Sequence, residues 1–207
     1  METCILVGMS RDPDRTRQAI LEAALGEIHR HGFQAASLHR ILSHTNVTKG
    51  ALYHHFPNKK ALGYAVVEEI LEEMVVRDWL EPLESATDPV SVLKDRLREV
   101  AKKLRVEDLL LGCPISNLAL EMSPVDEGFR TRVNRIYDRW REGFAAAFAR
   151  GQEHGTVRKD IDPLETATFV VGSMAGCRSL AKNAQSVKIM QGCMKSLLLY
   201  WDSLRGG

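Results

Sequence analysis

The side chains best suited to contact a nucleic acid lie between residues 37 and 60, which read SLHRILSHTNVTKGALYHHFPNKK. Lys49, Gly50 and Ala51 would form a small, positively charged helix start that can approach a phosphate backbone and the edges of bases closely. Tyr53 and His54 follow about one helical turn later. These residue types and this spacing indicate recognition of a nucleic acid.

Two short helices joined by a tight turn would position these side chains. Ser37 is expected to cap the first helix with its hydroxyl, and Thr48 the second. Between them, Asn46 tolerates the positive φ that a sharp reversal often needs. The first helix has one apolar face, formed by Leu38, Ile41 and Leu42. This layout is that of a helix-turn-helix DNA reader.

The segment resembles the DNA-binding domain of the TetR family of transcriptional regulators, in which a pattern close to IA..AGVSKGTLYHYFPSKEAL spans this region. Leu42, Thr45 and Asn46 depart from the pattern, which has Ala, Ala and Gly there. The resemblance implies phosphate contacts by Ser37, Tyr53 and Lys60, and contacts at or near base edges by Thr48, Lys49, Gly50 and His54. Two roles stay open, since Lys49 reaches phosphate as easily as a base and the His54 ring can instead pack on Tyr53 or Phe56.

The whole chain has the pattern of an all-α protein. Arg17 to Phe33 carries an apolar stripe and ends at Gly32, so it is expected to complete a three-helix domain with the two helices above. We place this helix-turn-helix domain at residues 11–57 and a helical effector-binding and dimerisation domain at 58–207. Residues 1–10 are assigned to an N-terminal extension whose order the sequence leaves open.

Charge and cysteine usage agree with a cytoplasmic DNA-binding protein. The net charge is only +1, but residues 1–60 hold eight Lys and Arg against five Asp and Glu, while residues 61–207 hold twenty against twenty-two. The four cysteines lack CxxC spacing, which argues against a zinc ribbon and a disulfide scaffold. The sequence has no run of eighteen apolar residues, so we expect no membrane span.

Catalytic and metal chemistry find little support. Cys113 could be a redox-sensing or catalytic thiol, but Pro114 follows it and no histidine and acid complete a triad, so a small buried residue is the better interpretation. The histidines before residue 61 have spacings that place them on different helix faces, which argues against a metal site. We therefore expect no metal, no cofactor and no enzyme activity.

The second domain should contain long helices. Asn58 can cap a helix that closes at Pro82, and an aromatic stripe predicts another from about Asp126 to His154.

Two final helices, about 163–181 and 186–204, are rich in small and apolar residues. These two either bury against their own domain or pair with a second copy in a four-helix bundle, through Val170, Met174, Met190, Met194, Leu197 and Trp201. A two-fold dimer would place two recognition helices about 34 Å apart on a pseudo-palindromic operator.

The resemblance also implies a small-molecule effector that releases the DNA. We expect its pocket to be lined by Met74, Trp79, Cys113, Asn117, Glu121, Tyr137, Trp140, Phe144 and Phe169. The aromatic members could equally be plain core. With Asn117 and Glu121 as polar anchors, the pocket would suit a mostly hydrophobic ligand with an amine or hydroxyl group.

The favoured function is therefore a DNA-binding regulator, with repression as the family default. Two other classes of function fit the sequence less well. A helical assembly protein without specific DNA recognition is disfavoured by the intact Thr48, Lys49 and Gly50 sequence and the basic N-terminal domain. An enzyme on a helical scaffold is disfavoured because the sequence has no nucleophile and base pair, metal cluster or phosphate loop.

Overall fold

The computed structural model describes residues 13–103 and 105–207, and the predicted all-α fold class is confirmed in this part of the chain. Apart from the helices, these residues form one isolated β-bridge, between Val157 and Arg205. The chain divides into two compact units, the first ending at Val66 and the second running from Val67 to Gly207. The extension assigned to residues 1–10 lies outside the described residues. No helix among those described combines the length and apolar character needed to cross a bilayer.

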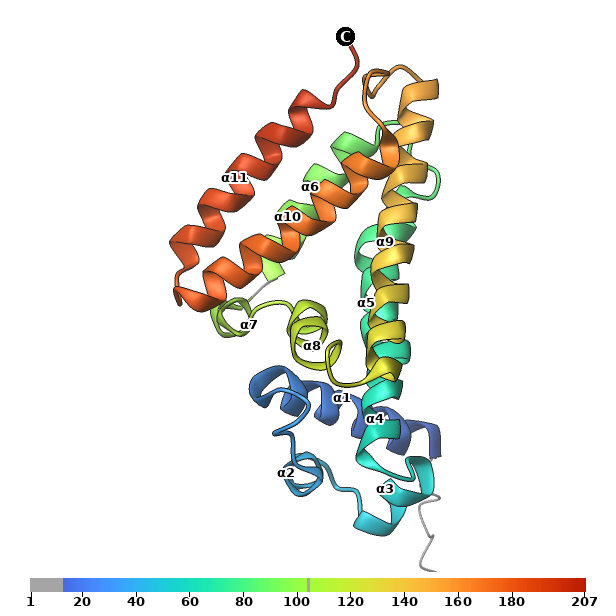
Figure 1. The fold of residues 1–207 in the computed structure, drawn as a ribbon, viewed down its shortest axis with the longest axis vertical. Coiled ribbons are helices and arrows are strands. Elements are labelled where there is room, and N and C mark those ends of the chain that lie inside the picture. The colour runs from blue at the N-terminus through green and yellow to red at the C-terminus, as the bar shows by residue number, and fades with distance from the viewer. Residues whose placement is uncertain (1–12, 104) are drawn as a thin grey trace, which may run out of the picture. The chain divides into compact units, whose positions relative to one another are not determined.

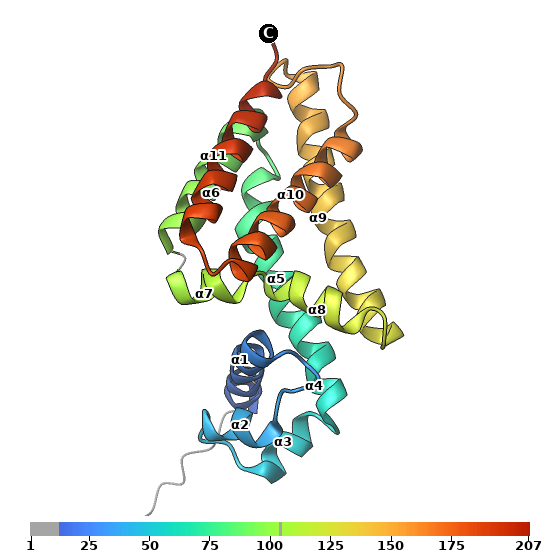
Figure 2. The same cartoon turned by 60° about the vertical axis from the view of Figure 1, so that its left-hand side comes forward.

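The first unit is built from four helices (Figure 2). They are α1 Pro13–His31, α2 Leu38–Ser43, α3 Lys49–His55 and α4 Lys59–Ala65. Their small apolar core consists of Ile20, Leu21, Ala24, Ile28, Phe33, Ile41, Leu52, Phe56 and Leu62. Gly32 ends α1 with a positive φ of 79°, as the sequence predicts.

The border between the units falls later in the chain than the sequence suggests. We placed it after residue 57, whereas the first unit continues to Val66. The reason is that Leu62 and Ala65 of α4 are buried and α4 packs on α1.

The second unit begins inside a long helical run. After α4, the run continues as η1 Val66–Leu71, α5 Glu72–Val75, η2 Val76–Leu80 and η3 Glu81–Leu83. The segments η1 and η2 are π-helical, and η3 is a 3₁₀ turn that contains Pro82. The expected helix from Asn58 to Pro82 is thus present, with π-helical turns that the sequence pattern does not predict.

Six further helices complete this unit (Figure 1). They are α6 Pro89–Lys103, α7 Val106–Leu111, α8 Pro114–Met122, α9 Glu127–Glu153, α10 Pro163–Asn183 and α11 Val187–Ser203. The predicted ranges of the three longest are confirmed to within two residues. The Asp126 side chain accepts a hydrogen bond from the Phe129 amide and caps α9, and Asp162 and Ser186 cap α10 and α11 in the same way.

The helix α10 packs against α9 on one side and α11 on the other, and α6 packs on η2 and α11 (Figures 1 and 2). The contact of α9 with η2 is close because residue 143 is glycine: a Cβ there would lie 2.6 Å from Leu80 Cδ2. Among the described residues, three ion pairs hold α9 to the same helical run: Arg132 and Arg135 lie 3.0 and 3.8 Å from Glu68, and Arg139 lies 2.7 Å from Glu72. The aromatic stripe of α9 is therefore fixed against Trp79.

Candidate nucleic-acid interface and ligand cavity

The first turn of α3 is exposed and carries a fixed cap. Thr48 Oγ1 accepts a hydrogen bond from the Ala51 amide at 3.2 Å, which confirms the predicted cap. Lys49 is exposed, and its Nζ lies 5.9 Å from the centroid of the Tyr53 ring. Tyr53 is itself 43% exposed. A cation and an aromatic hydroxyl therefore share one outward face of α3.

Neither packing nor backbone conformation requires a glycine at position 50 in this exposed turn. A Cβ built at this position meets no heavy atom within 4 Å, and the residue does not need a positive φ. Glycine in a helix costs about 1 kcal/mol relative to alanine. A residue that costs stability and fills no internal requirement is best explained by a partner that must approach the helix closely.

Ser37 occupies the predicted N-cap of α2, but it caps in a different way. Its hydroxyl makes no capping hydrogen bond; instead its backbone amide donates to Glu27 Oε1 at 3.0 Å. Arg40 Nε donates to the same oxygen at 2.6 Å. The expected hydroxyl cap is thus wrong. The sequence analysis also did not identify Glu27 as the acceptor for Ser37 and Arg40. An acidic residue between the apolar positions Ala24 and Ile28 is the signal that could have revealed it.

Glu27 is only 5% exposed, so its charge depends on these partners. Burial by itself raises the pKa of this carboxyl group. The hydrogen bonds from the Ser37 amide and Arg40, and the positive charges of Arg40 and His31, outweigh burial and lower the pKa below its ordinary value. The ionised carboxylate therefore joins α1 to the start of α2.

The turn between α2 and α3 is held by a side chain that departs from the family pattern. Thr45 Oγ1 donates to the Leu42 carbonyl at 3.1 Å and accepts from the Val47 amide at 3.3 Å. Asn46 keeps a negative φ, since Gln185 is the one non-glycine residue with positive φ in the described part of the chain. The expectation of a left-handed Asn46 is wrong because the threonine hydroxyl closes the turn instead.

The other DNA-contact candidates are also at the surface of the first unit. His54 is exposed, and its ring lies 5.4 Å from that of His55, edge to face. Lys60 is exposed at the start of α4. The structure thus leaves the seven candidates at least partly accessible, and their contacts with DNA remain a prediction.

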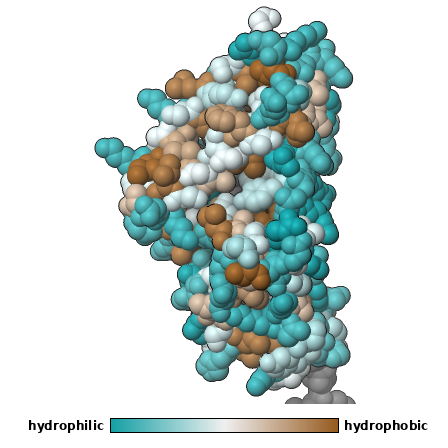
Figure 3. Space-filling view, in the orientation of Figure 1, coloured by the Kyte–Doolittle hydropathy of each residue, from teal (hydrophilic) through white to brown (hydrophobic). Residues whose placement is uncertain are grey.

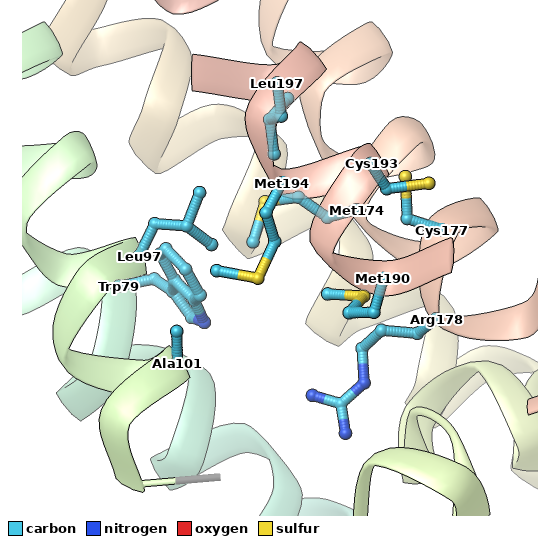
Figure 4. Close-up of a pocket in the computed structure, with 10 residues that line it drawn as sticks. All are labelled: Trp79, Leu97, Ala101, Met174, Cys177, Arg178, Met190, Cys193, Met194 and Leu197. Atoms are coloured by element: carbon cyan, nitrogen blue, oxygen red, sulfur yellow. The ribbon is translucent and has the colours of Figure 1, made fainter. Parts of the chain in front are cut away.

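The second unit contains a small cavity of about 40 Å³ (Figure 4). Its lining comes from η2, α6, α10 and α11 and consists of Trp79, Leu97, Ala101, Met174, Cys177, Arg178, Met190, Cys193, Met194 and Leu197. Of the residues predicted to line the effector pocket, Trp79 lies in this wall. Trp140 and Phe144 pack directly behind it, with ring centroids 6.0 and 6.3 Å from that of Trp79.

The remaining predicted pocket residues lie elsewhere in the second unit. Tyr137 exchanges a hydrogen bond of 3.1 Å with Ser116, and burial raises the pKa of Tyr137. The Asn117 side chain donates to the Leu111 carbonyl and accepts from Lys182, so its polar groups are engaged. Cys113 is buried, Phe169 faces an outer groove, and Met74 and Glu121 are half-buried away from this cavity. Their role in ligand binding stays a prediction.

Comparison with known proteins identifies the family. Residues 20–66 match the model of bacterial regulatory proteins of the tetR family, and residues 89–196 match that of the LmrA/YxaF-like transcriptional regulator C-terminal domain. The chain belongs to the TetR family. It is therefore a DNA-binding transcriptional regulator with a helix-turn-helix, in a family of regulators and not of enzymes.

Individual TetR-family relatives agree with this assignment. The transcriptional repressor DhaR of Mycobacterium sp. strain GP1 is 29% identical over 170 residues, which are 81% of this chain and 82% of DhaR. The regulator LmrA of Bacillus subtilis strain 168 is 24% identical over 88% of this chain and 96% of its own. A TetR regulator from Chloroflexus aurantiacus has the same fold, with a TM-score of 0.80 over 94% of this chain and 98% of its own, at 24% identity.

In this TetR-family chain, the two last helices form an open groove of about 520 Å³. It is lined by Phe169, Ser173, Cys177, Lys188, Ile189, Gly192, Cys193, Ser196, Leu197 and Tyr200. Figure 3 shows apolar and neutral side chains gathered over the region of α10 and α11, whereas the side of α9 is mostly hydrophilic.

Of the residues predicted for a dimer interface, Leu197 lines this groove and the other five do not. Val170, Met174, Leu197 and Trp201 are buried within the chain itself, and Met190 and Met194 line the inner cavity. Both α10 and α11 carry apolar side chains on their inner and outer sides, and the dimer interface stays a prediction. The outward residues include Phe169, Ile189 and Leu199.

Proposed function

We propose that this TetR-family regulator represses transcription by binding a pseudo-palindromic operator as a homodimer, and that a small molecule bound in the second unit releases it. The observation that carries the DNA-binding part is the exposed first turn of α3. Thr48 fixes the turn, Lys49 provides a charge, and Gly50 leaves room for a groove edge. DhaR, a relative over most of the chain, is named a repressor, and we propose the same direction of control here.

The homodimer part rests on the groove between α10 and α11. Phe169 and Ile189 are large, apolar and exposed there, Leu199 of α11 is exposed as well, and a cluster of such side chains marks a site that a partner can cover. Gly172, Gly176 and Gly192 lie on the same two helices, and a Cβ at any of them meets nothing within 4 Å. Small residues on an exposed helix face let a second pair of helices approach closely.

The effector part rests on the lining of the inner cavity. Arg178 is the one charged residue in a wall otherwise made of apolar and sulfur-bearing side chains. Its Nη2 donates to the Gly112 carbonyl at 3.0 Å, while its Nε is buried and has no hydrogen-bond partner among the described residues. Buried donors without a partner are uncommon and favour an acceptor from outside the chain. We therefore propose an apolar effector with a carboxylate or another acceptor group, and not the amine suggested by Asn117 and Glu121 in the sequence.

The cavity must open before such a ligand fits. Ligand pockets usually measure about 300 to 1,000 Å³, and this cavity measures about 40 Å³. Methionine side chains are flexible, so Met174, Met190 and Met194 can rearrange around a ligand. A ligand that binds the opened conformer more tightly shifts the population toward it, and release of DNA follows if that conformer presents the two α3 helices at another spacing.

Selection of bound duplexes from random DNA tests the operator proposal. We expect enrichment of a sequence with two inverted half-sites about one helical turn apart. Enrichment of single, unpaired half-sites would contradict the dimer part, and enrichment of no sequence would contradict specific recognition.

A melting-temperature screen tests the effector proposal, with pairs of apolar carboxylates and their matching amines. We expect the carboxylates to raise the melting temperature of the wild type and to lose that effect in Arg178→Gln. Stabilisation by the amines, or equal stabilisation of both proteins, would contradict the assigned anchor.

A further inference from the structure

Two cysteines from neighbouring helices meet between the cavity and the outer groove. Cys177 of α10 and Cys193 of α11 line both hollows, so they form part of the wall that separates them. Figure 4 shows the two side chains next to each other, and the two thiols interact. Both residues are partly exposed and neither is in a disulfide.

The surroundings distinguish the two sulfurs. Burial and the hydrogen bond with Cys193 raise the pKa of Cys177 to about 12, so Cys177 keeps its proton at neutral pH. Because Cys177 keeps its proton, Cys193 is the sulfur suited to attack first, and Cys177 is the one suited to follow.

We propose that Cys177 and Cys193 are a redox modification site at which a peroxide converts two thiols into one disulfide between α10 and α11. The Cys193 sulfur loses its proton and attacks one oxygen of the peroxide, the O–O bond breaks, and Cys193 becomes a sulfenic acid while the other oxygen leaves with that proton as water or an alcohol. Cys177 then attacks the sulfenic sulfur, the S–O bond breaks, and water leaves with the Cys177 proton. The two thiols supply the two electrons that reduce the peroxide, and a dithiol reductant reverses the change.

The cross-link would alter the same wall that ligand entry must move. Cys177 and Cys193 stand beside Met174, Met190 and Met194, which surround the cavity. A disulfide fixes the distance between its two backbones, so it would hold α10 and α11 together at this point. The consequence for effector entry rests on the proposed function, whereas the chemistry of the pair does not.

Peptide mapping of the full chain tests the site directly. In every protein Cys4 is replaced by serine, and hydrogen peroxide is added before free thiols are blocked with N-ethylmaleimide. We expect the loss of both thiols at 177 and 193, a single peptide pair joined by a disulfide, and recovery with dithiothreitol. Size-exclusion chromatography in denaturant should show that the disulfide lies within one chain.

Single substitutions separate the two roles. In Cys177→Ser, oxidation should stop at a sulfenic acid on Cys193 that dimedone traps, and in Cys193→Ser the Cys177 thiol should stay reduced. Cys113→Ser is the matched control, because Cys113 is buried and alone, and it should leave the disulfide unchanged. Oxidation of Cys113 as fast as the pair, a disulfide between two chains, or no disulfide at all would overturn the proposal. These measurements use no DNA, so their outcome is independent of operator binding.

Discussion

The first turn of α3 combines residues that the fold needs with residues that it does not. Thr48 is required locally, since it satisfies the Ala51 amide. Gly50 is not, because its missing side chain leaves open space. Stability and DNA binding should therefore respond in opposite directions to a change at Gly50.

We predict that Gly50→Ala stabilises the protein by about 0.4 to 1 kcal/mol and weakens operator binding by about 1 to 3 kcal/mol. The added methyl group reduces the freedom of the unfolded chain but occupies the space reserved for DNA. Urea unfolding and fluorescence anisotropy measure the two effects. Gly26→Ala in α1 is the control: its Cβ would lie 4.0 Å from the nearest atom, Arg30 Nη1, so it should stabilise the protein without changing DNA affinity. Unchanged DNA binding by Gly50→Ala would contradict the assigned role.

For Lys49 we predict a phosphate contact. Lys49→Ala should weaken binding to all sequences alike and reduce the slope of log K against log salt by about 0.9. The structure favours this outcome because Lys49 is exposed and its Nζ lies 5.9 Å from the centroid of the Tyr53 ring at the surface. A selective loss at one base position, with the salt slope unchanged, would show base readout instead.

At the residue scale, the sequence predicts an interaction correctly where a side chain bonds to a backbone amide only a few residues away. Thr48 and Asn58 cap the helices that follow them, as predicted. It failed where the partner comes from elsewhere. The carboxylate that receives the Ser37 amide is ten residues away, and no local pattern links the two.

Among the elements, α1 and α2 are joined through a buried charge. Glu27 accepts hydrogen bonds from the amide of Ser37, the N-cap of α2, and from the Arg40 side chain, and it contacts His31 of its own helix at 3.7 Å. The position of α2 therefore depends on the ionised state of one carboxyl group.

We predict that Glu27→Gln destabilises the protein by about 1 to 3 kcal/mol, because the buried amide cannot replace a carboxylate beside Arg40. The pKa of Glu27 is lowered in the folded state, so its stabilisation is complete above its ordinary pKa, about 4.3, and is lost as the pH falls toward and through the folded value. Urea unfolding at several pH values measures this. Glu22→Gln on the exposed side of α1 is the control and should change stability by less than about 0.5 kcal/mol at any pH. Equal pH dependence in wild type and Glu27→Gln would contradict the assignment.

The helices themselves were largely predictable, and their faces were not. Apolar spacing and caps place α9, α10 and α11 to within two residues. The π-helical segments η1 and η2 leave no such signal in the spacing of apolar residues. For α10 and α11, both sides are apolar, so spacing alone does not tell which side faces the interior.

At the scale of the whole molecule, binding to the proposed pseudo-palindromic operator requires two copies of the chain, which we propose are joined through the outward sides of α10 and α11. We predict that Ile189→Asp prevents dimer formation and lowers operator affinity while the chain stays folded, because this side chain is 38% exposed in the groove. The expected loss in dimer affinity is more than about 1 kcal/mol. Sedimentation equilibrium measures the oligomeric state. Leu120→Asp on α8, where the side chain is 76% exposed, should leave the dimer intact. A dimeric Ile189→Asp variant would place the interface elsewhere.

A gel-shift titration with DNA from upstream of the protein's own gene tests directly whether the first turn of α3 recognises specific DNA. We expect a specific, saturable shift that weakens steeply as salt rises and that is reduced in Gly50→Ala but not in Gly26→Ala. No shift at low salt with this or any neighbouring DNA, or equal shifts with unrelated sequences, would contradict it.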